Sequence, residues 1–326
     1  MRPEEQGSQA LKAIVHIFYA LFIVVPYYYL EALVTLFRPK KKPKSVKGEV
    51  VLITGTGHGI GKLLAIKYAQ EGATVVAWDI NEEVNVQTVQ HIQKLGYKNI
   101  YGYRVDVSNR QNVMETAQKV RNSVGDVTIL INNAGIMPHH LFLEHTEAEV
   151  RRIMDINVMA NFWTLQAFLP AMQKNNYGHV VTLSSMAGLL GLKNLVPYNA
   201  SKFAVRGLMD GLYEEFRRSP NNNVHFTTVY PYMVDTGLCK SVEITYPVFF
   251  KMLKPEYVVE KVFEAQVNNR RYISIPKSFE YLITLSTLFY PEKAINYFTD
   301  NIKTDLLSDI AFESKNQSNG DQKKAE

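Results

Sequence analysis

The chain alternates between short, almost wholly apolar segments and longer segments with apolar residues at helical spacing. The apolar segments lie at 49–55, 73–79, 99–107, 127–135, 179–185 and 224–231. Helical spacing follows at 60–70 and 82–95, and glycines at 72 and 96 mark where these helices end. Near-continuous apolar strands are typical of a parallel sheet that is covered on both faces. The pattern therefore predicts an α/β fold, a doubly wound parallel sheet with helices on both faces.

A different pattern precedes the first strand. Ala13 to Leu30 is an 18-residue run without Asp, Glu, Lys or Arg. As a helix it covers roughly 27 Å, just short of a hydrocarbon core of ~30 Å. Continuing to Phe37 makes it long enough, with Glu31 as its single charge, and Tyr27–Tyr29 suit the headgroup level. We expect residues 13–37 to form an N-terminal membrane-anchoring helix.

Other interpretations of this run were weighed. A cleaved signal peptide is disfavoured because Glu4 and Glu5 precede the run and no small-x-small cleavage site follows it. A buried core helix remains an alternative. Pro26 leaves open a bent, re-entrant hairpin in place of a straight span.

The formal charge of +5 comes from one stretch of the chain. Residues 38–47 contain six Lys or Arg and no acid, and outside them 30 basic residues face 31 acidic ones. The remainder gives no support for a nucleic-acid partner. By the positive-inside rule the basic stretch places the rest of the chain on the cytosolic side, and it attracts anionic lipid. The single cysteine, Cys239, permits no internal disulfide and favours a reducing compartment.

These features divide the chain into six parts. They are a polar segment (1–12), the anchor (13–37), a basic linker (38–47), the α/β domain (48–276), an apolar or amphipathic extension (277–312) and a disordered tail (313–326). Within the extension, residues 279–298 are apolar but are interrupted by Pro291-Glu292-Lys293. This is more typical of a packed or membrane-apposed helix than of a second span.

The first strand runs into a glycine-rich turn at Thr54–Gly61, with the pattern T-G-x-x-x-G-x-G, and a helix follows. Glycines permit a tight turn and a close approach of backbone N–H groups to a pyrophosphate, and the helix N-terminus favours its negative charge. The alternative is a turn without a ligand. Asp79, 24 residues after Gly55, ends the second strand, where an acid accepts ribose hydroxyls and repels a 2′-phosphate. This predicts NAD over NADP.

Further polar residues follow other strands. Asp106 ends the third strand, near the expected adenine position, and Asn132–Gly135 ends the fourth. All these strand ends fall on the carboxyl edge of the sheet, where open α/β folds bind ligands. The alternative role for Asp79 is a helix N-cap, although Asn81 is available for that role.

The chemical residues lie later in the chain. Tyr198 and Lys202 are four residues apart and hence on one helix face, 13 residues beyond Ser185. An ammonium group beside a phenol favours its ionised form. Tyr198 can then take the proton of a substrate hydroxyl while Ser185 hydrogen-bonds the same oxygen. Asn157, in another helix, can hold a water that relays the proton by way of Lys202.

With these motifs in order, the chain resembles a short-chain dehydrogenase/reductase, a family with the Rossmann fold. The similarity covers about residues 48–276 and includes Thr54–Gly61, Asp79, Asp106-Val107, Asn132–Gly135, Asn157, Ser185, Tyr198-x-x-x-Lys202 and Pro231…Thr236. Within the family the chain is similar to the branch of epidermal retinol dehydrogenase 2 and 17-beta-hydroxysteroid dehydrogenases 11 and 13. The resemblance implies an NAD-dependent oxidoreductase that oxidises lipophilic alcohols, of the retinol or hydroxysteroid class, at a membrane or lipid-droplet surface.

The resemblance also implies particular site residues. Catalysis falls to Ser185, Tyr198, Lys202 and Asn157. The cofactor is bound by Gly55, His58, Gly59, Ile60, Gly61, Asp79, Asp106, Asn133, Tyr198, Lys202 and Thr236, with Thr236 at the carboxamide. His58 stands where some NADP-preferring relatives carry a basic residue. Tyr232 replaces the glycine that often follows Pro231 in the family and is expected to narrow the nicotinamide side.

Several expectations concern the setting. Leu238–Leu253 falls where relatives carry a substrate lid, with a plain surface helix as the alternative. The final Lys323-Lys324-Ala325-Glu326 resembles an endoplasmic-reticulum retrieval signal, although a chance lysine pair is an equal alternative. Localisation to the endoplasmic reticulum membrane or a lipid droplet follows, facing the cytosol. A homodimer through the helices of Asn157 and Tyr198 is expected by analogy only.

Two rival functions keep the same fold. One is an NADPH-dependent reductase of a keto-lipid or retinal, which Asp79 disfavours. The other is a non-enzymatic lipid-droplet scaffold, which the intact catalytic set disfavours. A metal site at His139, His140 and His145 is not expected, because no cysteine joins them and Glu144 is the only close acid in the run. We expect these histidines on a loop near the substrate mouth.

Overall fold

The structure is a computed structural model. It describes residues 12–37, 42–238, 242–244, 251–277, 291–301 and 304–306, together with Phe279, Tyr281, Ile283, Leu285 and Phe289. The chain forms two units, residues 1–43 and residues 44–326, which are taken separately below. Cys239 and the predicted tail at 313–326 lie outside the described residues.

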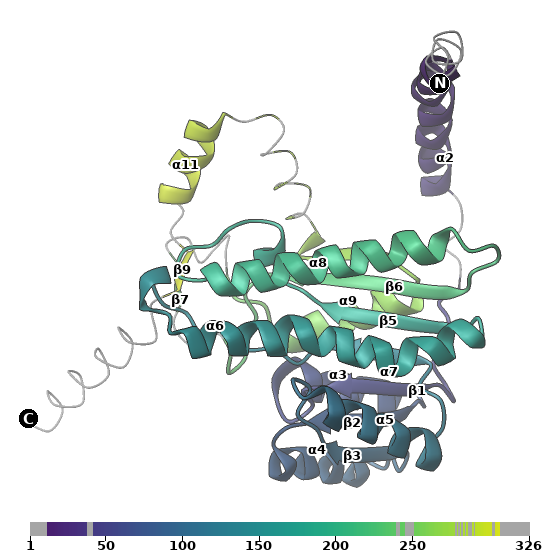
Figure 1. Cartoon of the computed structure of the whole chain (residues 1–326), viewed down its shortest axis with the longest axis vertical. Coiled ribbons are helices and arrows are strands. Elements are labelled where there is room, and N and C mark those ends of the chain that lie inside the picture. Colours follow the sequence, from purple (N-terminus) through teal and green to yellow (C-terminus); the bar gives the residue numbers. More distant parts are fainter. Residues whose placement is uncertain are drawn as a thin grey trace, which may run out of the picture. The chain divides into compact units, whose positions relative to one another are not determined.

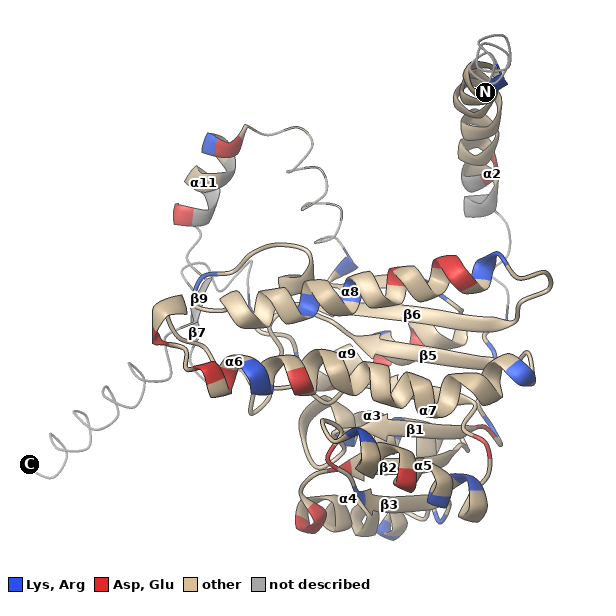
Figure 2. Ribbon diagram, in the orientation of Figure 1, with Lys and Arg blue, Asp and Glu red and all other residues tan. Residues whose placement is uncertain are grey.

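In the first unit, the described residues 12–37 form a helix. Its apolar part, Lys12–Glu31, has a mean hydropathy of 1.8, and no part of its most apolar stretch is buried. By length and composition it can therefore cross a membrane. Figure 2 shows this helix almost free of charged residues. A π-helical turn, η1 (Ala20–Val24), precedes Pro26 and leads into α2 (Val25–Phe37). Proline lacks an N–H and crowds the preceding turn, and the wider turn accommodates it. Within the described residues the chain stays helical through Pro26 and does not reverse there.

The second unit is built on a seven-stranded sheet in the order β3-β2-β1-β4-β5-β6-β8, with every neighbouring pair parallel. The strands are β1 (Val50–Thr54), β2 (Thr74–Asp79), β3 (Ile100–Arg104), β4 (Ile129–Asn132), β5 (Gly178–Leu183), β6 (Val224–Pro231) and β8 (Tyr272–Ile275). The first six confirm the predicted strands, and the doubly wound Rossmann sheet is confirmed with them. The seventh strand was not predicted.

Helices cover both faces of the sheet (Figure 1). One layer holds α3 (Gly59–Gln70), α4 (Glu82–Lys94) and α9 (Pro255–Val267), and the other holds α5 (Arg110–Ser123), α7 (Ala160–Lys174) and α8 (Val196–Arg217). Strand side chains alternate between the layers: Val51 and Ile53 pack on the α3 side, whereas Leu52 packs on the α7 side. Burial on both faces explains why the strands are apolar throughout.

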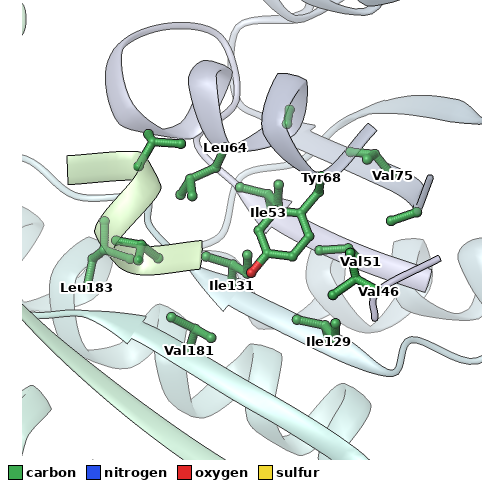
Figure 3. Close-up of a cluster of buried hydrophobic side chains, with 14 of the residues drawn as sticks. Val46, Val51, Ile53, Leu64, Tyr68, Val75, Ile129, Ile131, Val181 and Leu183 are labelled. Carbon is green, nitrogen blue, oxygen red and sulfur yellow. The ribbon is translucent and has the colours of Figure 1, made fainter. Parts of the chain in front are cut away.

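The core on the α3 side centres on Tyr68 (Figure 3). Its ring is fully buried and packs edge-on against Phe263 of α9, at 5.3 Å between ring centroids. Its hydroxyl donates a hydrogen bond to Gln266 Oε1 at 3.3 Å, so the buried polar atom is satisfied. Val46, within the predicted linker, is also buried in this core.

Smaller elements complete the unit. They are η2 (Phe142–Glu144), α6 (Glu147–Met154), η3 (Asp155–Met159), η4 (Met186–Gly188), β7 (Val242–Ile244), α11 (Glu292–Asn301) and β9 (Thr304–Leu306). β7 and β9 form a two-stranded antiparallel pair. Thus Val242–Ile244, inside the predicted lid or surface-helix segment, is a strand, and most of the rest of that segment lies outside the described residues.

We expect Phe168→Ala to destabilise the fold by about 3–5 kcal/mol, because it empties a closely packed site. Phe168 is 2% exposed and its ring lies 5.6 Å from that of Trp78. The measurement is urea unfolding of the full chain. Phe162→Ala on the same helix is the matched control: its side chain is 38% exposed, so its loss should cost under about 1 kcal/mol. Equal losses would contradict the assignment of Phe168 to the core.

Candidate active site

A cleft of about 570 Å³ opens at the carboxyl ends of the parallel strands. Twelve of the predicted site residues line it: Gly55, His58, Gly59, Ile60, Gly61, Asp79, Asp106, Asn133, Ser185, Tyr198, Lys202 and Thr236. Asn157 is not among its lining residues. β1 and β4 are neighbours in the sheet, although β2 and β3 intervene in sequence on the other side. The cleft therefore lies at the topological switch point, where doubly wound folds bind ligands.

The glycine turn after β1 forms one end of the cleft. Gly55 and Gly59 have positive φ angles of 74° and 57°, which side-chain-bearing residues rarely adopt. Gly61 is required for a different reason: a Cβ there would lie 1.9 Å from the carbonyl oxygen of Gly55. The turn thus lies directly against the first turn of α3. The N-terminus of that helix opens beside the turn, and a pyrophosphate fits such a cradle.

Asp79 stands at the end of β2 beside this turn. Its Oδ2 accepts a hydrogen bond from the Gly57 N–H and its Oδ1 accepts one from the Asn81 N–H, both at 2.8 Å. Asn81 is the N-cap of α4, since its side chain accepts from Val84 N–H at 3.2 Å. Asp79 therefore does not cap α4, and its half-buried carboxylate is fixed at the wall of the cleft.

Asn133 and Asp106 have structural partners at the same edge. Asn133 Nδ2 donates to the carbonyl oxygens of Thr54 and Gly55, at 2.8 and 3.2 Å. Asp106 Oδ1 accepts from the hydroxyl of Ser108 at 2.6 Å and from its N–H at 3.0 Å. Both side chains thus shape the cleft by bracing its backbone as well as lining it.

The predicted catalytic residues converge at the other end of the cleft. Tyr198 and Lys202 lie on one face of α8, and both are at least 94% buried, at 6% and 5% exposure. The Lys202 ammonium group lies 5.5 Å from the centre of the Tyr198 ring. Ser185 follows β5 as the N-cap of η4, and its Oγ accepts from Ala187 N–H at 3.1 Å. Ser185, Tyr198 and Lys202 all line the cleft, so a substrate hydroxyl has access to the three.

Burial changes the acid–base behaviour of Lys202. It lowers the pKa of the ammonium group to about 8. One donated hydrogen bond, to the carbonyl oxygen of Leu183 at 3.0 Å, keeps the group fixed in the sheet edge. A cation held this close to a phenol stabilises the phenolate.

Asn157 lies one layer behind the cleft. Its side-chain amide is paired in both directions with the backbone of Ile136, at 2.9 Å each, and also donates to Ser201 Oγ at 3.1 Å. A Cβ placed on Gly135 would lie 3.2 Å from Asn157 Oδ1 and 3.7 Å from Lys202 Nζ. Asn157 and Lys202 therefore border the same small space beside Gly135, where only glycine fits comfortably. The side-chain amide of Asn157 holds the loop that follows β4.

The apolar lining of the cleft was not predicted, and it includes Phe279 and Ile283. They lie beyond the last strand of the sheet and join Leu190, Leu192, Leu195 and Met233 in an apolar wall. The Phe279 ring packs edge-on against Tyr232, at 5.0 Å between centroids. Thr236, also half-buried at the cleft, approaches Gly59: a Cβ on Gly59 would lie 3.6 Å from Thr236 Cβ. Tyr232 also lines the cleft. Its position directly after Pro231 predicted that it lies near the site, whereas no motif predicted a place there for Phe279.

The three histidines at 139, 140 and 145 come after the part of the chain that lines the cleft. His139 and His140 are buried in the segment between β4 and η2, and neither they nor His145 line the cleft. His139 and His140 lie on the loop that follows β4, as expected, and come just after its residues 133–137, which line the cleft. The Glu144 carboxylate accepts a hydrogen bond from Leu141 N–H at 3.2 Å, which caps η2 after this loop.

Comparison with known proteins agrees with this geometry. A family profile described as short chain dehydrogenase matches residues 49–246. Short-chain dehydrogenase/reductase family 16C member 6 of Bos taurus is 43% identical, over 77% of this chain and 79% of its own. Epidermal retinol dehydrogenase 2 of Mus musculus is 40% identical, over 79% and 84% of the two chains.

Two further similarities extend the comparison. Estradiol 17-beta-dehydrogenase 11 of Homo sapiens is 37% identical, over 88% of this chain and 94% of its own. A crystal structure of a short chain dehydrogenase/reductase from Burkholderia phymatum in complex with NAD superposes with a TM-score of 0.68 at 28% identity. That similarity covers 81% of this chain and 99% of the bacterial one.

The low pKa of Lys202 gives a prediction about stability. Because it lies at about 8 in the folded chain against an ordinary 10.5, the folded chain binds fewer protons than the unfolded chain between these values. Wild-type stability therefore rises with pH through that window. We expect the stability of Lys202→Met relative to wild type to fall by about 2–3 kcal/mol from pH 7 to pH 10.

Urea unfolding at the two pH values measures this change. Lys94→Met is the control, because Lys94 is exposed and its charge stays in water. The assignment fails if Lys202→Met and Lys94→Met change in parallel with pH.

Proposed function

Because the chain belongs to the short-chain dehydrogenase family, whose members are oxidoreductases acting on CH–OH groups, we propose that it oxidises a lipophilic alcohol to the carbonyl with NAD. The alcohol is of the retinol or hydroxysteroid class, in keeping with the names of two relatives. A hydride acceptor, the nicotinamide, is what the bound cofactor supplies. The remaining steps belong to the chain's own side chains.

One observation carries the proposal: the Ser185–Tyr198–Lys202 set borders the same cleft as an apolar wall. A lipophilic alcohol that packs against Leu192, Leu195 and Phe279 can present its hydroxyl to Ser185 and Tyr198, which line the same cleft. Tyr198 accepts the hydroxyl proton, and Ser185 donates a hydrogen bond to the same oxygen. Lys202 stabilises the phenolate. A water held by Asn157 relays the proton onward by way of Lys202.

The cofactor proposal rests on Asp79. Its carboxylate is held by two backbone N–H groups, so it cannot swing away from a ligand at the end of β2. A fixed negative charge there accepts the ribose hydroxyls of NAD and repels the 2′-phosphate of NADP. His58, exposed at the N-cap of α3, is a feature in favour of NADP.

The setting is proposed from the first unit. Its helix is long enough to cross a membrane, and six basic residues follow at 38–47. We place the enzyme on the endoplasmic reticulum membrane or a lipid droplet, facing the cytosol, because basic flanks stay on the cytosolic side. Lipophilic alcohols partition into the same phase.

Tyr198→Phe should lower kcat/KM for alcohol oxidation by about 10²–10⁴-fold, because it removes the proton acceptor and keeps the ring. The assay is NADH formation by the full chain in membranes supplied with retinol or estradiol. Tyr213→Phe, on the same helix, is the matched control and should keep activity. Binding of NADH should be unchanged in Tyr213→Phe. Wild-type turnover by Tyr198→Phe would remove the catalytic assignment, and no turnover by wild type would favour the scaffold alternative.

Asp79→Asn should raise the ratio of kcat/KM with NADP to that with NAD by about tenfold to a hundredfold, or 1.4–2.8 kcal/mol. The amide keeps an acceptor for Gly57 N–H and loses the negative charge. Using the ratio cancels any general loss of activity. Glu82→Gln, at the start of α4, should leave the ratio unchanged. A wild-type preference for NADPH would favour the reductase alternative.

A further inference from the structure

Three potential metal ligands lie together outside the cleft. They are His140 on the loop after β4, His145 just after η2, and Glu149 in the first turn of α6. One ligand atom from each lies within 4.8 Å of the others. The histidine segment alone does not predict this cluster, because its carboxylate, Glu149, belongs to the next helix.

The distances suit a small cation. His140 Nε2 lies 3.3 Å from Glu149 Oε1, and His145 Nδ1 lies 4.0 Å from Glu149 Oε2. Metal–ligand bonds of about 2.0–2.1 Å in a tetrahedral site place ligand atoms about 3.3 Å apart. The first pair already has that spacing, and the widest pair in the cluster, within 4.8 Å, needs to close by up to about 1.5 Å to reach it. The two imidazole rings lie 5.0 Å apart between centroids.

His145 is the residue that a purely structural role leaves unexplained. Its side chain is 1% exposed, yet neither ring nitrogen has a hydrogen-bond partner among the described residues. His140 Nδ1 is likewise buried and unpaired within that part of the chain. Burying a polar atom without a hydrogen-bond partner disfavours the fold. His140 approaches Glu149 to 3.3 Å, whereas His145 reaches it only at 4.0 Å, so an ion shared by the three side chains would satisfy the buried ring nitrogen of His145.

The exposure and orientation of the cluster agree with ligation. The Glu149 side chain is 35% exposed, which leaves an entry path and room for a water as fourth ligand. Glu149 Oε2 also accepts from the Thr146 N–H at 2.9 Å, and this helix cap orients the carboxylate.

We propose that His140, His145 and Glu149 bind a divalent transition-metal ion, of which Zn²⁺ is the representative. Two imidazoles and one carboxylate are a ligand set that zinc uses, and hard cations such as Mg²⁺ prefer oxygen alone. The ion joins the loop after β4 to the start of α6. That loop begins with Asn133 and Met137, which line the cleft, so the ion fixes one wall of the site from outside it.

The test is metal binding by the untagged full chain in detergent after chelator treatment. Isothermal titration with Zn²⁺ gives the stoichiometry and Kd, and the visible absorption of bound Co²⁺ reports tetrahedral geometry. We expect one ion per chain and a rise in thermal midpoint on binding. Removing a ligand should weaken binding at least about tenfold.

Two variants and one control decide the outcome. Glu149→Gln removes the carboxylate and keeps the helix cap, because glutamine serves equally in a capping box. His145→Phe fills the buried space without a ligand atom. His91→Ala, an exposed histidine on α4, should bind as wild type does. Absence of a stoichiometric ion in wild type overturns the proposal, as does equal affinity in Glu149→Gln. Should His145→Phe fail to fold by circular dichroism, Glu149→Gln alone decides.

Discussion

The hydrogen bonds between the ends of β1 and β4 hold the site together. The Thr54 hydroxyl accepts from the N–H groups of Asn133 and Ala134, both at 3.0 Å, while the Asn133 amide donates back to the backbone at Thr54 and Gly55. These two strands are neighbours at the point where the chain winds outward in opposite directions. The connections leaving them diverge, and the crevice between them receives the glycine turn on one side and the catalytic residues on the other. The positions of the glycine turn and of the loop after β4 therefore depend on these hydrogen bonds.

Chemistry at this joint requires placing charge where folding disfavours it. Lys202 is buried against the Leu183 carbonyl, and its pKa is lowered to about 8 in consequence. A more exposed lysine would favour the fold, yet its field at Tyr198 would be screened by water. Asp79 shows the opposite solution, since two backbone N–H groups stabilise its carboxylate at the wall of the cleft. The buried ammonium group of Lys202 thus disfavours folding but lies close to Tyr198. The carboxylate of Asp79 is stabilised by its hydrogen bonds and held in one position.

The sheet and the twelve cleft residues were predictable because their signals are local. A strand buried on both faces is apolar throughout, and a glycine turn, Asp79 or a Tyr-x-x-x-Lys pair is visible in a few adjacent letters. β8 was missed because the apolar signal around Tyr272–Ile275 is short and is interrupted by Ser274, whereas β4 lies within a longer apolar run. Phe279 was missed because its contact with Tyr232 joins positions 47 residues apart in a segment with no periodic signal. The contact between His140 and Glu149 was not predicted, since nothing in the histidine segment shows that α6 places a carboxylate beside it.

The proposed function also explains why an apolar wall and an apolar helix occur in one chain. A retinol-like or steroid-like alcohol is scarce in water, so a soluble enzyme would meet it rarely whatever its catalytic set. An anchored enzyme samples the phase in which that alcohol is dissolved, and the local concentration replaces affinity as the source of encounter. The cleft then needs to recognise little beyond one hydroxyl beside Tyr198, because Leu192, Leu195 and Phe279 offer contact without direction. Specificity among lipophilic alcohols therefore depends on the shape of that wall, while the catalytic residues determine the reaction.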